Sequence, residues 1–156
     1  MKILHIGDVV ARHGRRVVQK LLPALIEEHG IDFVIAQSEN MATGNGLTIK
    51  SVQELQKAGV DFFTGGNHSF KKPAFNTYFN DATIPVIRPG NFAHDKPGRG
   101  HAVVDTPHGK ILIINVLGHN VLPAYYEGPA IDNPFQYVDQ VLAEHAHETF
   151  AAIIVD

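Results

Sequence analysis

The residues best suited to chemistry in this 156-residue chain stand just beyond apolar runs. Gly7-Asp8 follows the first run, Glu39-Asn40 the second, and Gly66-Asn67-His68 the third. Carboxylate and amide oxygens are hard donors that suit Mn²⁺, Fe or Mg²⁺. A histidine can donate a proton near neutral pH. The residue types therefore favour a metal-dependent hydrolytic site.

The elements that carry these residues alternate between strand and helix patterns. We expect strands over residues 2–6, 32–36, 60–64, 84–87, 101–106, 110–116 and 151–155. We expect helices over residues 14–28, 49–58, 69–79 and 133–149, with Pro23 kinking or dividing the first and Thr48 capping the second. Repeated βα units predict an α/β fold with a largely parallel sheet, to which the 101–116 hairpin adds an antiparallel part.

Parallel neighbouring strands would bring these residues together, because ligands bind outside the carboxyl ends of such strands. Each signal alone has a structural alternative. Asp8 could cap the following helix, and Glu39-Asn40 or Gly66-Asn67-His68 could form turns. Their common placement after three successive strands favours a shared site.

Composition narrows the classes of protein to consider. The chain is 44% hydrophobic and 19% charged, and its length favours one domain over residues 1–156. A net charge of −3 gives no overall electrostatic argument for binding nucleic acid or an anionic membrane. The absence of cysteine excludes disulfides and thiolate catalysis, and is compatible with the cytoplasmic location we expect. No apolar run approaches the roughly 18 residues that would indicate a membrane span.

These stretches resemble a known family, the YmdB-like branch of the calcineurin-type metallophosphoesterases. The matching segments are Ile6-Gly7-Asp8-Val9-Val10, Ser38-Glu39-Asn40, Gly44-Asn45-Gly46-Leu47-Thr48, Gly65-Gly66-Asn67-His68, Arg88-Pro89-Gly90-Asn91-Phe92 and Asp132-Asn133-Pro134-Phe135. The resemblance implies a calcineurin-like metallophosphoesterase sandwich. It also implies a phosphodiesterase that hydrolyses P–O bonds of nucleotide phosphodiesters, with 2′,3′-cyclic nucleotides the first expectation.

The resemblance also implies roles for individual residues. Asp8 would bind a first metal ion with help from Asn40, Glu39 would bridge two ions, Asn67 would bind the second, and His68 would be the general acid. The ions are expected to be Fe or Mn, with Mg²⁺ as an alternative, and a bridging hydroxide would be the nucleophile. Arg88, Asn91 and His119 are expected to bind substrate.

The family pattern continues with histidines beyond the strand that ends here at Asp156, and this chain lacks them. The resemblance therefore implies an amino-terminal part of the family's length, with a fold incomplete at the carboxyl end. We expect weak metal binding and little activity from residues 1–156 alone, and an open sheet surface that favours homo-oligomers. The family's usual glycine after Val10 is Ala11 here.

A function of another class remains open. The chain could be a non-catalytic nucleotide- or metal-responsive protein with a regulatory or scaffold role, which the missing downstream histidines favour. The nearby pair His145 and His147 does not replace them, because residues two apart on a helix point away from each other. We expect both to lie on a solvated helix face.

Overall fold

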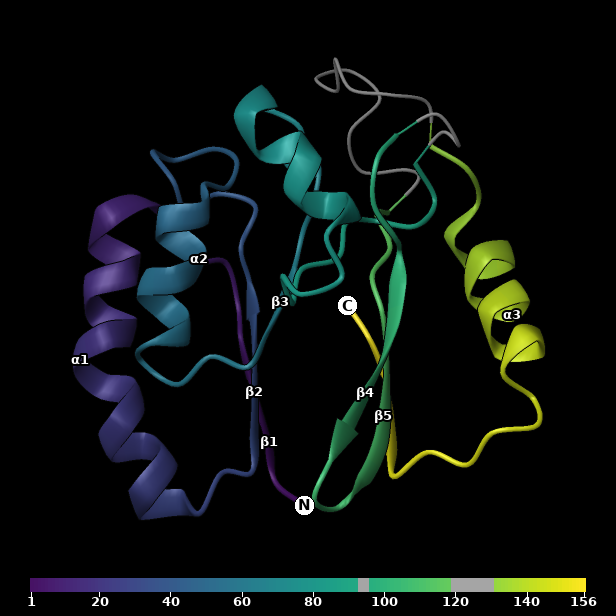
Figure 1. Cartoon of the computed structure of the whole chain (residues 1–156), viewed down its shortest axis with the longest axis horizontal. Coiled ribbons are helices and arrows are strands. Elements are labelled where there is room, and N and C mark those ends of the chain that lie inside the picture. The colour runs from purple at the N-terminus through teal and green to yellow at the C-terminus, as the bar shows by residue number, and fades with distance from the viewer. Residues whose placement is uncertain (93–95, 119–130) are drawn as a thin grey trace.

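Two three-stranded sheets face each other, and helices cover their outer sides (Figure 1). The computed structural model describes residues 1–92, 96–118 and 131–156. The first sheet is parallel, in the order β1 (Ile3–Ile6), β2 (Phe33–Gln37), β3 (Phe62–Thr64). The second contains β4 (His101–Thr106), β5 (Gly109–Ile114) and β6 (Ala152–Val155), with β4 antiparallel and β6 parallel to β5. The helices are α1 (Ala11–His29), α2 (Ile49–Gln56), the 3₁₀ helix η1 (Pro73–Asn80) and α3 (Pro134–Glu144).

Side chains alternate between two core layers along the central strands. On β2, Val34 and Ala36 face the helices α1 and α2, whereas Phe33 and Ile35 face the second sheet. Strand β5 alternates likewise, with Ile111 and Ile113 turned between the sheets and Leu112 and Ile114 turned toward α3. Both strands are therefore buried on two faces, as expected for the middle of an α/β sandwich.

The parallel register aligns the carboxyl ends of the first three strands. Ile6 pairs with Ala36, and Gln37 pairs with Thr64. The segments that follow each strand consequently leave the sheet at the same edge. This is the placement that the sequence predicted for Asp8, Glu39 and Asn67.

Helix α1 is longer than predicted, because it begins at Ala11 rather than at residue 14. Ala11 adopts a positive φ of 50°, which is uncommon for a residue with a Cβ. Pro23 does not divide the helix. The proline removes a hydrogen bond to Gln19, but both residues are exposed, so water can reach the freed carbonyl. Gly30, with a φ of 59°, closes the helix in the left-handed conformation.

Three other predicted elements differ in extent. Residues 84–87 do not form a strand, because Pro85 has no N–H to donate and only Val86 bridges to Phe63. The helix predicted over 69–79 is the shorter η1, which starts at Pro73 where a proline suits a first turn. Helix α3 stops at Glu144, and the next residues turn through a bond from Glu148 N to the His145 carbonyl.

Other expectations are confirmed. Thr48 caps α2 in a reciprocal capping box with Ser51. Strand β6 carries an exposed apolar surface, with Ile153 49% and Val155 50% exposed. Within the described ranges, no helix is both long and apolar enough to cross a membrane.

Candidate active site

Asn40 is the centre of the candidate site. Its amide nitrogen donates to both carboxylate oxygens of Asp8, at 3.0 and 2.9 Å. Its amide oxygen lies 2.6 Å from Nδ1 of His68. One side chain therefore links a residue that follows β1 with a residue that follows β3. Asp8 is exposed and His68 partly buried, so the linked groups are open to solvent on one side.

Glu39 joins this group through the backbone. Its Oε2 accepts a hydrogen bond of 2.9 Å from the His68 N–H. A Cβ at Gly66 would overlap the Glu39 carboxylate, so only glycine lets the chain pass this closely. Gly66 thus serves the close packing of the 65–68 turn against Glu39, whereas a Cβ at Gly65 would overlap the Ser69 hydroxyl.

Short-range bonds hold these loops at the sheet edge. The Ser69 hydroxyl accepts from Gly66 N at 2.9 Å and donates to the Gly66 carbonyl at 2.8 Å. The Ser38 hydroxyl donates to the Thr64 carbonyl at 2.6 Å, and Ala11 N donates to the Asn40 carbonyl at 2.9 Å. Backbone and buried hydroxyl groups therefore fix the loops that carry the site.

Asn67 lies in the same turn, and its partly exposed side chain makes no hydrogen bond to any described residue. It is therefore free to act as an oxygen ligand. Among the described residues, no group of three or more His, Cys, Asp or Glu side chains is arranged to hold a metal ion. The donors present are the Asp8 and Glu39 carboxylates together with the amides of Asn40 and Asn67.

Arg88 and Asn91 form their hydrogen bonds with described residues other than those of this cluster. The Arg88 guanidinium, 7% exposed, donates to the carbonyls of Pro89, Gly90, Lys96 and Pro97. Burial lowers its pKa from the ordinary value. Asn91, 1% exposed, donates to the carbonyls of Leu117 and Asp132 and accepts from Leu117 N. In this arrangement both residues shape their loop. His119 lies outside the described residues.

Asn115 is a residue that the sequence reasoning missed. It follows β5, is 2% exposed, and accepts from Gly65 N at 2.9 Å while donating to the Asp156 carbonyl at 3.1 Å. It therefore ties the end of β3 to the end of β6 across the two sheets. The signal was available, because Asn115 ends an apolar run in the same way as Asp8 and Glu39 do.

The histidine pair that follows the last helix corrects a prediction. His145 is not on a solvated face, because its ring packs edge-on against His101 and Phe150 and its Nδ1 lies 2.7 Å from Glu148. His147 is exposed as expected. Helix α3 ends before both residues, so helical spacing does not describe them.

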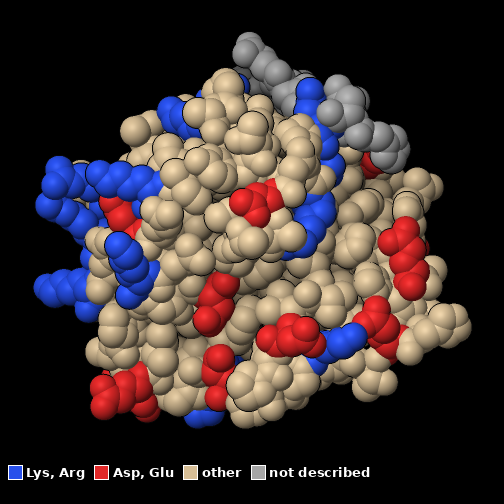
Figure 2. All heavy atoms as spheres, viewed as in Figure 1, with Lys and Arg blue, Asp and Glu red and all other residues tan. Residues whose placement is uncertain are grey.

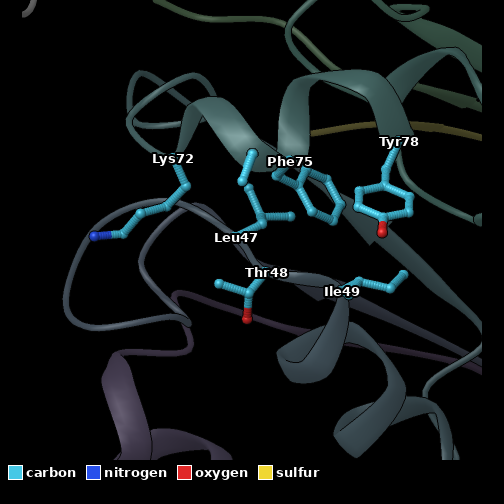
Figure 3. A pocket seen from close by; sticks show the side chains of 7 residues that line it. Leu47, Thr48, Ile49, Lys72, Phe75 and Tyr78 are labelled. Atoms are coloured by element: carbon cyan, nitrogen blue, oxygen red, sulfur yellow. The ribbon is translucent and has the colours of Figure 1, made fainter.

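An apolar hollow of about 180 Å³ lies between η1 and the start of α2 (Figure 3). Figure 3 shows Phe75 and Tyr78 of η1 above Thr48 and Ile49 at the start of α2. Its lining is Leu47, Thr48, Ile49, Lys72, Ala74, Phe75 and Tyr78. None of the linked residues at the strand ends contributes to it, so the hollow and the Asp8–His68 cluster are separate features.

Comparisons with known proteins agree with this architecture. A family model described as YmdB-like protein matches residues 4–156. A Bacillus subtilis (strain 168) protein described as 2′,3′-cyclic-nucleotide 2′-phosphodiesterase is 36% identical over 150 residues, which cover 96% of this chain and 54% of the relative. A solved structure described as a novel phosphatase from Mycoplasma pneumoniae is 30% identical with a TM-score of 0.85, covering 100% of this chain and 54% of that one.

A more distant structure extends the likeness of fold. A 5′-nucleotidase precursor from Thermus thermophilus has a TM-score of 0.63 at 13% identity, covering 98% of this chain and 36% of that one. The predicted calcineurin-like α/β sandwich is thereby confirmed. The chain spans about half the length of the curated relative that it matches.

Proposed function

Because this chain belongs to the YmdB-like protein family, we propose that it carries metal-ligand and proton-donor residues of a phosphodiesterase. The observation that carries the proposal is the bonded series from Asp8 through Asn40 to His68, with Glu39 held against the same turn. Three separate strand ends supply these groups. A purely structural turn would need only one of them.

The donor set fits hard metal ions. Asp8 and Glu39 would supply charge, and Asn67 would supply a neutral oxygen. Asn40, whose amide nitrogen donates to both oxygens of Asp8, would assist by holding that carboxylate in place as a ligand. Bound metal ions, Fe or Mn by resemblance, would supply charge stabilisation and an activated water.

His68 would act as the proton donor. With the Asn40 carbonyl facing the ring, Nδ1 carries a hydrogen and donates it to that oxygen. The exchangeable proton is then on Nε2, which faces away from Asn40 and would protonate the leaving oxygen of the phosphodiester. Asn40 thereby orients the ring by the same contact that links it to Asp8.

The expected substrate is a nucleotide phosphodiester, with a 2′,3′-cyclic nucleotide first. The name of the Bacillus subtilis relative supports this choice. We assign residues 1–156 to one metallophosphoesterase domain, and we place the protein in the cytoplasm. The metal site of this domain would take further ligands from a longer chain. The exposed apolar surface of β6 supports self-association as part of the proposal.

Metal binding tests the proposal on this chain directly. Titration calorimetry with Mn²⁺ should detect weak binding that Asp8→Asn and Glu39→Gln each weaken about tenfold or more. Asp105→Asn, which removes an exposed carboxylate on β4, should leave the affinity unchanged. Equal affinity in all four proteins would overturn the ligand assignment.

Hydrolysis tests the reaction. On a longer chain that reaches the length of the relatives, His68→Ala should lower kcat for a 2′,3′-cyclic nucleotide about 100-fold or more, the usual contribution of a general acid. His147→Ala, which removes an exposed histidine, is the control. Mn²⁺ binding at Asp8 and Glu39 without hydrolysis by the longer chain would favour a non-catalytic, metal-responsive protein instead.

A further inference from the structure

A basic hollow of about 230 Å³ lies on the side of the molecule formed by α1 and α2. Its lining is Arg12, Arg15, Arg16, Gln19 and Glu54. Figure 2 shows Lys and Arg side chains gathered on this side, where they project from the surface around a single patch of acidic atoms. The local charge is therefore positive, although the whole chain carries a net charge of −3.

The Arg15 side chain is engaged in bonds within the protein. Its Nε donates to Glu54 at 2.7 Å, and its Nη1 donates to the carbonyls of Met41 and Ala42. The ion pair neutralises the single carboxylate of the hollow. Arg15 also joins α1 to the loop that directly follows Glu39 and Asn40.

The side chains of Arg12 and Arg16, unlike that of Arg15, are not engaged in such bonds with described residues. Both are exposed, and neither forms an ion pair or hydrogen bond with another described residue. They are four residues apart on α1, so they lie one turn apart on the same face. Residues 11–20 contain Arg12, Arg15, Arg16 and Lys20 and no acidic residue. Two unpaired guanidinium groups thus flank a hollow whose only carboxylate is already paired.

The hollow is close to the candidate active site along the chain. Arg12 follows Asp8 by four residues, so their Cα atoms are at most about 14 Å apart. Ala11 N donates to the Asn40 carbonyl at 2.9 Å, which fixes the start of α1 against the site. A short oligonucleotide can span this separation, whereas a mononucleotide has only the phosphate that occupies the reacting position.

On the premise of the proposed phosphodiesterase, we propose that Arg12 and Arg16 bind backbone phosphates of a single-stranded oligoribonucleotide whose terminal phosphodiester lies at Asp8 and His68. The guanidinium fork matches a phosphate through two parallel hydrogen bonds, and neither arginine must first break a bond within the protein. The substrate class would therefore extend from a free cyclic mononucleotide to the end of an RNA strand.

Binding of a fluorescent single-stranded oligoribonucleotide, followed by anisotropy, tests this inference without turnover. The double variant Arg12→Gln/Arg16→Gln should weaken binding about tenfold or more at low salt. The slope of log K against log salt should fall by about 1.4, since each phosphate contact on a single strand contributes roughly 0.7. The matched control is Lys2→Gln/Lys110→Gln, which removes the same charge just before β1 and at the start of β5; it should keep the slope.

Equal binding by the two double variants would overturn the inference, as would tighter arginine-dependent binding to phosphatidylserine vesicles than to the oligoribonucleotide. Failure of the proposed function has a different signature. Arginine-dependent binding would then persist while Asp8→Asn and Glu39→Gln left Mn²⁺ affinity unchanged, and the polynucleotide surface would still be supported.

Discussion

The Asn40 amide nitrogen donates to both carboxylate oxygens of Asp8, at 3.0 and 2.9 Å. Such a contact holds the two residues at fixed positions although they follow different strands. Because the oxygen of the same amide meets the ring of His68, any change at Asn40 acts on Asp8 and on His68 together.

Asn40→Ala should therefore weaken Mn²⁺ binding about tenfold to 100-fold, the usual cost of losing a group that orients a ligand. Titration calorimetry on this chain measures the effect. Thr43→Ala, in an exposed position of the same loop, should bind Mn²⁺ as the unmodified protein does. An Asn40→Ala protein with undiminished affinity would show that the contact with Asp8 has no part in metal binding.

Gly66→Ala should disturb Glu39 without removing any of its atoms. The new Cβ would occupy the space of the Glu39 carboxylate, which must move and give up its bond with His68 N. We expect Mn²⁺ affinity to fall about tenfold. The control is Gly7→Ala, because a Cβ there meets nothing within 4 Å. Similar affinities for the two variants would mean that the position of Glu39 is unimportant for the metal.

Ala11→Gly should stabilise the protein. Ala11 has a φ of 50°, and the left-handed conformation costs a residue with a Cβ roughly 1–2 kcal/mol. Glycine avoids this cost but loses more backbone entropy, so we expect the free energy of unfolding to rise by about 0.5–1 kcal/mol. Urea unfolding gives the value. Ala24→Gly, in the exposed interior of the same helix, should lower it by a similar amount. A loss of stability in both variants would contradict the strain at Ala11.

His101 should make stability depend on pH. Burial lowers its pKa from 6.5, and nearby His145 and Arg99 lower it further, while Glu144 opposes them. As pH falls below 6.5, His101 therefore takes up a proton more readily in the unfolded chain than in the folded protein. The contribution of neutral His101 to the free energy of unfolding is fully present above pH 6.5. It declines as pH falls from 6.5 toward the lower pKa that His101 has in the folded protein.

Urea unfolding at about pH 7.5 and about pH 5.5 measures this loss. The decrease in unfolding free energy between the two conditions should be smaller for His101→Gln than for the unmodified protein. His147→Gln, at an exposed position, should keep the full decrease. Equal decreases in all three proteins would remove His101 as the cause.

Much of the first sheet could be predicted from the sequence. The apolar runs before Asp8, Glu39 and Asn67 are the strands β1, β2 and β3, with bounds within two residues of those expected. The carboxyl ends of these three strands could be placed at one edge of the sheet, because parallel neighbouring strands end on the same side. The Asn40 bridge could not be predicted, because periodicity says nothing of which side chains touch between two loops.

The loop after residue 87 shows the other limit of sequence reasoning. Arg88 and Asn91 have the residue types of a substrate pocket, yet their polar groups bind the carbonyls of their own surroundings. Those carbonyls come within reach of the two side chains only once the chain has folded. Asn115 likewise meets its partners between the two sheets. The sequence alone does not distinguish such donors from ligands.

The division of the core has a consequence for how the protein forms. All residues of the core layer between the first sheet and its helices lie between Leu4 and Val86 in the sequence. The layer between the two sheets, in contrast, also contains residues of β4 and β5. Domains fold from the amino end during synthesis. The segment that holds Asp8, Glu39, Asn40 and His68 therefore leaves the ribosome with every residue of its own core layer, before β4 and β5 supply the layer that the two sheets share.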